Sequence, residues 1–464
     1  MNLRLSFVFL SALLGVLFGH GSVATVRHNG VAYFIDLDRN YAQVSNGRSC
    51  RGDIVIMSHV SYDGHTYTVT EINEKAFFEN FNLTSVSIPN TIREIPKSAF
   101  ESCYGLESVS IPSSVVCIDD FAFFHCFKLN DVVIPESVNK LGVGVFSNCK
   151  NLKTITIPKS IKRLGKGNSN PEGYGVSLGV FSGCESLVEV NLHDGIDSIG
   201  KDTFVSCTSL KHIDLPKSLQ FIGEDAFNNC AVLESIEIPD GIECIEKGTF
   251  VSCYNLKSVK LPSGISVIKQ DAFTACKSME NIDLPDKLEE LGSWAFSRCE
   301  SLKSIVLPFS VSKIGSYCFD GCEALESVDL GLVQEIERDA FKGCAKIRNV
   351  YCHWDEPLEV SPRPFYGDYG DVERYGVLHV PAGTGDKYKS SDTWRHFWWI
   401  ADDVAGVESV GDNAIGRDIL CDVYSLDGIK LYGSIYSYSI GDVLPKGIYI
   451  LKFGNGNLQK IAIK

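Results

Sequence analysis

The chain has 464 residues, of which 44% are hydrophobic and 22% are charged, and its formal net charge is −15. This composition is typical of a folded protein rather than a disordered one. The excess of carboxylates argues against a nucleic-acid-binding protein, because nucleic acid favours basic surfaces. It argues equally against an electrostatic attachment to anionic lipid.

The first 24 residues have the pattern of a secretory signal peptide. Arg4 supplies a positive charge, a mostly apolar run follows from Leu5 to Phe18, and Ser22-Val23-Ala24 offers small residues for cleavage after Ala24. An uncleaved membrane anchor is the alternative, but a spanning helix needs about 20 apolar residues. We therefore predict a secreted or cell-surface protein whose mature chain has no transmembrane span.

Residues 25–70 have the pattern of β-hairpins, with Asp63-Gly64 as a favourable two-residue turn. We predict that they cap one end of the repeat array that follows, because an open-ended solenoid needs a polar cap. Asp36, Asp38 and Asn40 resemble the start of a calcium loop, yet the Gly and Glu that such a loop requires are missing. A hairpin turn is the favoured interpretation, and no metal site is predicted.

A repeat of 23 residues dominates the chain. Phe recurs, with one step of 35 residues and one of 22, at positions 77, 100, 123, 146, 181, 204, 227, 250, 273, 296, 319 and 341. Three residues later a Cys follows in eleven copies, at 103, 126, 149, 184, 207, 230, 253, 276, 299, 322 and 344. From Phe204 one unit reads F-x-x-C-x-x-L-x-x-I-x-L-P-x-x-L-x-x-I-G. Such periodicity is typical of a solenoid.

Each unit contains the elements of one coil. Leu210, Ile213 and Leu215 predict a short half-buried strand, and the following Pro ends it. Leu219 and Ile222 form a second inward pair, and the segment 226–230 predicts a turn of helix around Phe227. One unit cannot bury its own apolar side, so the units must stack. We predict about a dozen coils of 23 residues whose strands pair in parallel, with short helical or 3-10 turns.

One coil carries an insertion. Between Cys149 and Cys184 twelve extra residues rich in Gly, Asn, Ser and Pro predict a surface loop over 165–177. Its glycines do not indicate a phosphate site, because no Gly-Lys-Ser/Thr follows them. An elaborated binding loop remains the functional alternative to a plain one.

The columns of Phe, Cys, Pro and paired aliphatic residues resemble the BspA-like leucine-rich repeats from about Glu71 to Tyr351. Like that family, the chain has Ser or Gly where other leucine-rich repeats carry Asn, at Ser137, Ser160, Ser218 and Gly241. Asn80 replaces Cys in the first coil, as expected of a terminal unit. The resemblance implies a leucine-rich-repeat solenoid over 71–351 and a surface protein that engages host matrix or other cells.

After Tyr351 the period ends. Residues 352–401 resemble the segment that closes such arrays, and their aromatic residues are interpreted as a plug for the last coil, with a sugar platform as the alternative. Residues 402–418 predict a linker. Residues 419–464 predict a small β-sandwich that resembles the sorting domain of the type IX secretion system, whereas an accessory β-domain is the alternative.

The chain offers little that indicates catalysis. The eleven periodic cysteines are predicted to be buried thiols that fill small spaces in the core, since an odd column of equivalent positions has no built-in pairing; disulfides remain open. The histidines lack metal-ligand spacing and a neighbouring nucleophile motif. We predict no enzyme, no cofactor and no catalytic residue.

The outward residues of the strands are the candidate binding face. They flank the central aliphatic residue of each strand and comprise Ser85, Ser87, Ser108, Ser110, Thr154, Thr156, Glu189, Asn191, His212, Asp214, Glu237, Lys260 and Asp283. An extended recognition face of this kind predicts adhesion to an extracellular protein or glycan. Ordinary polar residues on an exposed sheet are the plainer interpretation, and a surface scaffold without a specific ligand is the alternative function.

Overall fold

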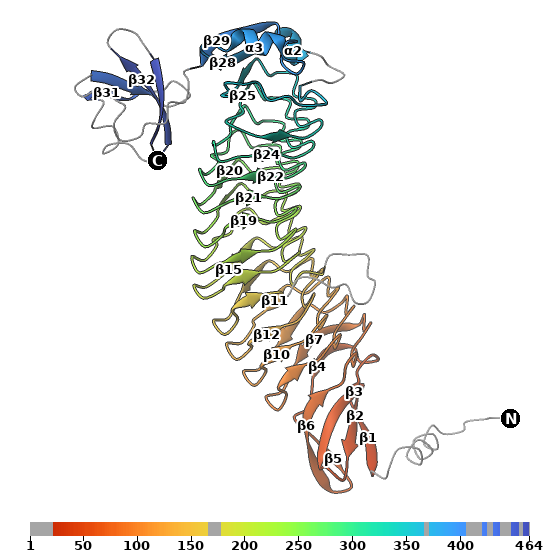
Figure 1. The fold of residues 1–464 in the computed structure, drawn as a ribbon. Helices are drawn as coiled ribbons and strands as arrows, with labels where there is room; N and C mark the ends of the chain where they lie inside the picture. Colours follow the sequence, from red (N-terminus) through yellow and green to blue (C-terminus); the bar gives the residue numbers. More distant parts are fainter. Residues whose placement is uncertain are drawn as a thin grey trace, which may run out of the picture. The chain divides into compact units, whose positions relative to one another are not determined.

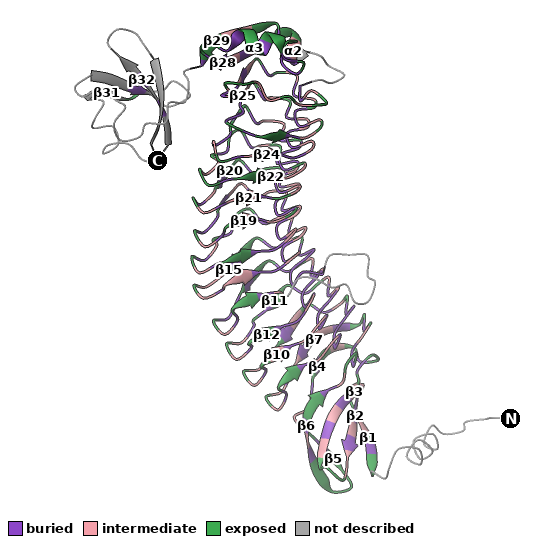
Figure 2. Ribbon diagram, viewed as in Figure 1, coloured by how far each residue is buried: buried purple, intermediate pink, exposed green. Residues whose placement is uncertain are grey.

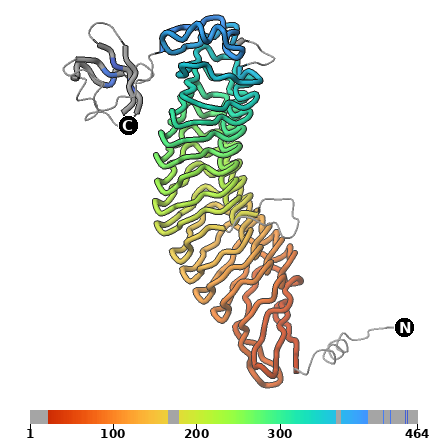
Figure 3. Tube along the Cα trace, viewed as in Figure 1, coloured from red at the N-terminus to blue at the C-terminus, as the bar shows by residue number. Residues whose placement is uncertain are grey.

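The computed structural model describes residues 22–165, 178–365 and 371–404, together with four strands between residues 420 and 463 (Figure 1). The chain forms two compact units. Unit 1 comprises Met1–Ile242 with Thr249–Tyr254, and unit 2 comprises Glu243–Gly248 with Asn255–Lys464. Within each unit, successive coils of the chain lie side by side in sequence order (Figure 3).

Unit 1 begins with a five-stranded sheet in the order β1-β2-β3-β6-β5. Its strands are β1 (Val23–His28), β2 (Val31–Asp36), β3 (Tyr41–Asn46), β5 (His59–Tyr62) and β6 (His65–Ile72). The hairpins β2–β3 and β5–β6 are antiparallel, whereas β3 and β6 pair in parallel. Between the two hairpins, β4 (Gly52–Val55) pairs in parallel with the first repeat strand. The parallel sheet of the solenoid thus starts before the first Phe of the repeat.

The coils of unit 1 build two parallel ladders. The main sheet carries β4 and then β7 (Leu83–Ser87), β9 (Ser108–Ser110), β11 (Asp131–Val132), β13 (Thr154–Thr156), β15 (Glu189–Asn191) and β18 (Ser235–Glu237). The second ladder has two-residue strands: β8 (Glu94–Ile95), β10 (Cys117–Ile118), β12 (Lys140–Leu141), β14 (Arg163–Leu164), β16 (Ser198–Ile199) and β17 (Phe221–Ile222). Paired strands are in register, so equivalent residues of successive coils lie side by side.

Unit 2 contains the same two kinds of strand. Its main-sheet strands are β20 (Ser258–Lys260), β23 (Ser304–Val306), β25 (Ser327–Asp329), β27 (Asn349–Tyr351), β28 (Val377–Pro381) and β29 (Trp399–Val404). Its second ladder comprises β19 (Cys244–Ile245), β21 (Val267–Ile268), β22 (Glu290–Leu291), β24 (Lys313–Ile314) and β26 (Glu335–Ile336). The strands β23-β25-β27-β28-β29 form one parallel sheet, as predicted for stacked coils.

The core of each unit is a stack of phenylalanine rings. In unit 1 each repeat Phe from Phe77 to Phe250 is buried and stacks on the next, with ring centroids 4.8–5.8 Å apart. In unit 2 the stack Phe296-Phe319-Phe341-Phe365 has spacings of 4.9–5.5 Å. The Phe rings are buried together with the Leu and Ile columns of the repeat. Each coil therefore depends on its neighbours for stability.

The segment around each Phe is a pair of turns, and the predicted turn of helix is wrong. Asp225 and Asn229, on either side of Phe227, have left-handed backbone conformations with φ of 54° and 59°. Phe227 and Asn229 consequently donate their N–H groups to the next coil, at Thr249 O (2.9 Å) and Val251 O (2.7 Å). A helix would direct these donors along its own chain, whereas the observed turns link neighbouring coils.

The cysteine column also links coils. In unit 1 the thiol of each column cysteine is free and buried, and it donates to the carbonyl of the repeat Phe one coil earlier, as Cys207 does to Phe181 at 3.3 Å. Asn80, which stands in place of Cys, instead donates to Gly47 O (2.8 Å) and Cys50 O (3.0 Å). The second residue after a strand-ending Pro adds a further link where it is Ser: Ser218 Oγ donates to Ile196 O in the preceding coil at 2.7 Å.

The C-terminal part of unit 2 contains the described helices, α2 (Asp371–Tyr375) and α3 (Gly385–Ser390). Further along the chain, β30 (Leu420–Tyr424), β31 (Lys430–Tyr436), β32 (Gly447–Phe453) and β33 (Leu458–Ile463) form an antiparallel sheet in the order β31-β30-β32-β33. Among the residues that the structure describes, no helix is long and apolar enough to cross a membrane.

Candidate functional site

The predicted binding residues lie on the exposed side of the main sheet. Along β13, β15, β20 and β23 the central residue is buried and the two flanking residues are exposed (Figure 2). In unit 1 the register places Ser85 beside Ser108, and Thr154 beside Glu189. Where the strands pair, the candidate residues of successive coils therefore lie side by side, although the pairing is interrupted between β11 and β13 and between β15 and β18.

Two coils depart from the predicted strands. Residues 211–216 and 280–285 are not assigned to a strand, although Ile213 and Ile282 are buried as in the other coils. His212 and Asp214 are nevertheless exposed, and Nε2 of His212 lies 2.8 Å from Oδ1 of Asp214. Asp283 is exposed as well. The inward apolar residues, rather than the hydrogen-bond ladder, fix which side chains face outward in these coils.

The first strands of the face are rich in hydroxyl groups. Oδ1 of Asp53 accepts hydrogen bonds from Thr84 Oγ1 and Ser85 Oγ, both at 2.7 Å. These two bonds lower the pKa of the Asp53 carboxyl, since they favour its charged form. Further along, Ser110, Thr154 and Thr156 are exposed. This part of the face presents hydroxyls that can both donate and accept hydrogen bonds.

A ladder of aromatic rings runs beside these hydroxyls and was missed by the sequence analysis. Phe81, Tyr104 and Phe127 stack with ring centroids 4.9 and 4.7 Å apart, and the ammonium of Lys150 lies 5.8 Å from the centre of the Phe127 ring. All four directly follow the cysteine position of the repeat. The sequence contains this column as a 23-residue spacing of positions 81, 104, 127 and 150. These positions precede the strands and so are not among the predicted outward residues of the sheet.

The later coils of unit 1 present charged and amide groups. Asn191 Nδ2 donates to Glu189 Oε1 (3.0 Å) and to Thr156 Oγ1 (3.3 Å). A neighbouring column, one residue before these positions, contains the ion pair of Lys211 with Glu234 at 3.3 Å. Exposed ion pairs contribute little to stability. They do fix the pattern of charge that a partner would meet.

The C-terminal strands of the main sheet carry a second polar cluster that the sequence analysis missed. His379 on β28 places Nδ1 3.0 Å from Oδ1 of Asp403 and Nε2 3.2 Å from Oδ1 of Asn349, and its ring stacks on Tyr351 at 4.4 Å. Burial is the main cause that raises the pKa of Tyr351, and Asp403 adds to it. Asn349, His379 and Asp403 lie in different coils, so no short sequence motif predicts that they come together.

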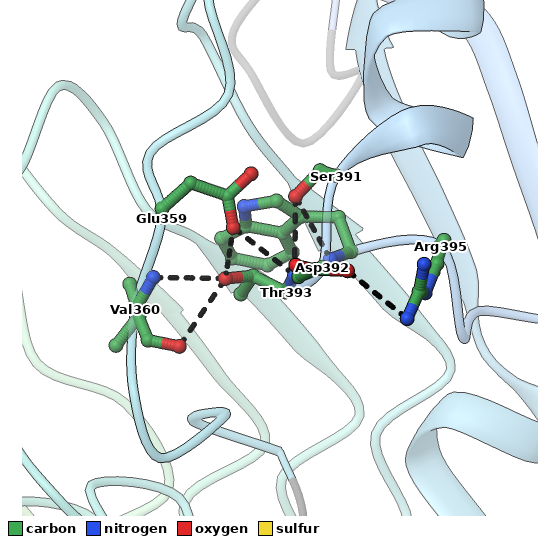
Figure 4. A network of polar contacts seen from close by, with 7 residues as sticks. Glu359, Val360, Ser391, Asp392, Thr393 and Arg395 are labelled. Atoms are coloured by element: carbon green, nitrogen blue, oxygen red, sulfur yellow. Dashed lines mark hydrogen bonds and ion pairs between the residues drawn. The ribbon is translucent and has the colours of Figure 1, made fainter.

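Part of the closing segment forms the predicted aromatic plug. Tyr388, Trp394 and Phe397 are buried in unit 2, and Trp394 Nε1 donates to Leu358 O at 2.7 Å. Figure 4 shows a network of polar contacts in the same segment, in which Thr393 Oγ1 donates to Glu359 Oε2 at 2.8 Å. Trp398 and Trp399 were predicted to join this plug, but they are 76% and 60% exposed.

Two predicted features lie wholly or partly outside the described residues. The insertion loop is described only at Gly165. The next described residue, Leu178, packs on Phe121 and Phe124. The signal segment is described only from Ser22. Ala24, the predicted cleavage point, lies within β1 and pairs with Ile35.

One group of side chains within the described residues has ligand atoms close enough for a metal ion. It consists of Glu94, Cys117 and Asp119 on the second ladder. The ammonium of Lys140 lies 2.9 Å from Oδ1 of Asp119 and already supplies a positive charge there. Burial raises the pKa of the Cys117 thiol, which disfavours the thiolate that a metal needs. The group is better suited to an internal ion pair than to a metal.

Comparison with known proteins agrees with this geometry. The family model of the BspA type leucine rich repeat region matches residues 65–168, 176–278 and 243–356. The chain belongs to this family. A leucine-rich repeat protein from Bacteroides ovatus is similar at 27% identity and a TM-score of 0.51, over 70% of this chain and 94% of that one.

A leucine rich cell surface protein from Faecalibacterium prausnitzii is similar to this BspA-type chain at 29% identity and a TM-score of 0.51. The likeness covers 71% of this chain and 94% of that one. A search of curated proteins finds no match. The shared repeat supports a surface or protein-binding role for this BspA-type chain, because repeat solenoids commonly present an extended binding surface.

Proposed function

We propose that this protein is exported and acts at the cell surface as a non-catalytic adhesion protein, binding an extracellular partner through the exposed side of its main sheet. The observation that carries this proposal is the in-register array of exposed side chains from coil to coil. A rigid scaffold that repeats polar groups in register suits an extended partner. The printed description of the Faecalibacterium protein as a cell surface protein supports the location.

Export is proposed from the two ends of the chain. Residues 1–24 have the pattern of a secretory signal. Residues 419–464 are proposed as a sorting module, and the described strands β30 to β33 pair with one another in a small antiparallel sheet. The polar segment 402–418 is proposed as the linker to this module, apart from its first residues, which belong to β29.

The polar clusters of the sheet support binding rather than catalysis. Both ring nitrogens of His379 are engaged, one by Asp403 and the other by Asn349. A histidine held in this way has no nitrogen left to activate a nucleophile. These two contacts hold the His379 ring in one orientation on the sheet.

A matched pair of variants tests the proposal. Thr156→Arg with Asn191→Arg adds two positive charges to neighbouring positions of the face, and Asn139→Arg with Gln220→Arg adds the same charge beside the second ladder, where both residues are exposed. Binding of the chain without residues 1–24 to immobilised matrix proteins and to intact cells is then titrated. We expect saturable binding of the unaltered chain and a loss of about tenfold or more in the face variant only.

Two results would overturn the proposal. If the unaltered chain bound neither matrix proteins nor cells, a scaffold without a specific ligand would be the better description. If the second-ladder variant lost as much binding as the face variant, the contact would not lie on the main sheet.

A further inference from the structure

The sheet face of unit 1 changes its chemistry along the coils. From β4 to β13 the ten flanking positions contain six Ser or Thr residues and two carboxylates: Asp53, Val55, Ser85, Ser87, Ser108, Ser110, Asp131, Val133, Thr154 and Thr156. From residue 189 to 237 the corresponding positions contain three carboxylates and one hydroxyl: Glu189, Asn191, His212, Asp214, Ser235 and Glu237. The first stretch is therefore rich in hydroxyls, with carboxylates at two of its ten positions, whereas the second has carboxylates at three of six.

The aromatic ladder borders the hydroxyl stretch. Phe81 precedes the first residue of β7 by two positions, so the ladder follows the margin where the strands begin. Phe81 is 53% exposed and Tyr104 is 39% exposed, although both are large and partly apolar. Burying such rings against a partner would remove apolar surface from water. Gly105 allows the coils to approach here, because a Cβ at this position would lie 2.6 Å from Phe81 O.

The charges beside the ladder are balanced. Lys128 pairs with Glu107 at 3.6 Å, and Lys150 pairs with Glu185 at 2.7 Å. A strongly anionic ligand would meet no excess of positive charge here and would be repelled by a chain of net charge −15. A cationic peptide would be drawn instead to the acidic positions from Glu189 onward.

We propose that the surface formed by the aromatic ladder and the hydroxyl columns from β7 to β13 binds a neutral oligosaccharide. This inference rests on the proposed function, since it names the ligand class for one part of the same face. Sugar hydroxyls pair with side-chain hydroxyls that both donate and accept. The polarised C–H groups of a sugar ring pack against the negative face of an aromatic ring. Phe81, the first ring of the ladder, is 53% exposed, and Tyr104 adds a phenolic hydroxyl.

The test uses the chain without residues 1–24 and isothermal titration with maltohexaose, chitohexaose and a high-mannose oligosaccharide as neutral probes. A heparin hexasaccharide serves as the anionic probe. The variants are Phe81→Ser, Tyr104→Ser and Ser110→Glu, and Tyr254→Ser is the matched control. Tyr254 follows a column cysteine like Tyr104 and has a similar exposed fraction, 40%, but it lies outside the hydroxyl stretch. Thermal unfolding of each variant establishes that the solenoid is folded.

We expect at least one neutral probe to bind, with affinity falling by about tenfold in Tyr104→Ser or Phe81→Ser and unchanged in Tyr254→Ser. Ser110→Glu should weaken binding without removing a ring. The inference is wrong if no neutral probe binds, if only heparin binds, or if Tyr254→Ser loses as much affinity as Tyr104→Ser. If the unaltered chain still bound cells or matrix proteins while no neutral probe bound, the glycan inference alone would fail and the adhesion proposal would stand.

Discussion

At the scale of single residues, the repeat pattern predicts the burial of the periodic cysteines but not their hydrogen bonds. Their 23-residue spacing in phase with Phe and Leu predicts inward side chains, and the structure confirms that all eleven are buried. Their bonds to the preceding coil were not predictable, because the sequence does not reveal where the carbonyl of Phe181 points relative to Cys207. Burial raises the pKa of the Cys253 thiol to about 12 and that of the Cys207 thiol well above its usual value, so these two thiols stay protonated and can donate.

Replacing Cys207 with alanine should lower the free energy of unfolding of unit 1 by about 1–2 kcal/mol. The change removes a buried sulfur and leaves the Phe181 carbonyl without the thiol donor at 3.3 Å. Urea denaturation followed by circular dichroism measures the loss. Thr208→Ala, at the next and more exposed position, is the control and should change stability by less than about 0.5 kcal/mol. Equal effects of the two substitutions would contradict this role of the thiol.

Asp202 predicts a pH dependence of stability. Burial, with a further contribution from Asp225, raises its pKa from 3.8 to about 6. The folded state thus favours the protonated form, and this stabilisation is complete below pH 3.8 and is lost as the pH rises through 6. Asp202→Asn resembles the protonated form and suits the left-handed conformation of this position, where φ is 58°.

We expect Asp202→Asn to be more stable than the unaltered chain by about 1–2 kcal/mol at pH 8, after allowance for solvent screening, and equal to it at pH 4. Thermal unfolding across this pH range provides the measurement. Asp271→Asn controls for placing Asn in a left-handed position, since φ of Asp271 is also 58°. A stability difference that did not grow between pH 4 and pH 8 would refute the assigned pKa.

At the scale of elements, apolar spacing predicted burial better than it predicted backbone conformation. Leu210, Ile213, Leu219 and Ile222 are all buried as the pattern indicated. The predicted turn of helix around Phe227 was wrong because the sequence alone does not show that its N–H groups bond to the next coil. Ser, Asn, Asp and Gly residues two positions before and after several repeat Phe residues were the available signal, since these types tolerate or support left-handed turns.

The residue that directly follows the second-ladder strand β22 must be glycine for the coils to approach each other. A Cβ on Gly292, which follows β22, would lie 2.5 Å from Gln270 N in the preceding coil. Gly292→Ala should therefore destabilise unit 2 by about 1–3 kcal/mol through overpacking. Lys269→Ala, one coil earlier at the same register, already has room for a Cβ and should cost at most about 1 kcal/mol through its ion pair with Glu246. Calorimetry would contradict this account if Gly292→Ala unfolded at the same temperature as the unaltered chain.

At the scale of the whole molecule, the repeat predicted the fold class and the outward residues of the strands. It did not predict that β4 adds a parallel strand before the first Phe, because Gly47 stands where the Phe77 ring packs and carries no apolar signal. The aromatic ladder and the His379 cluster were missed for another reason. Each is assembled from side chains of different coils, and these side chains lie outside the alternating strand positions that the repeat pattern marks.

The C-terminal strands predict a separable module. Among the described strands, β30 to β33 pair only with one another. Deleting residues 419–464 should leave the unfolding temperature of the repeat array nearly unchanged, while less protein reaches the surface of the native cell. Calorimetry and surface labelling measure the two effects. Normal surface amounts would contradict the sorting role, and a collapse in unfolding temperature would show that these strands cap the repeats.

The central claim is that the exposed side of the main sheet contacts an extracellular partner. The most direct measurement places a photo-crosslinking amino acid at Thr156, on β13, or at Asn139, beside the second ladder, and exposes each chain to the same cells and matrix proteins. We predict crosslinks from Thr156 that unlabelled protein competes away, and few from Asn139. Equal crosslinking from the two positions, or crosslinking from Asn139 alone, would contradict binding through this face.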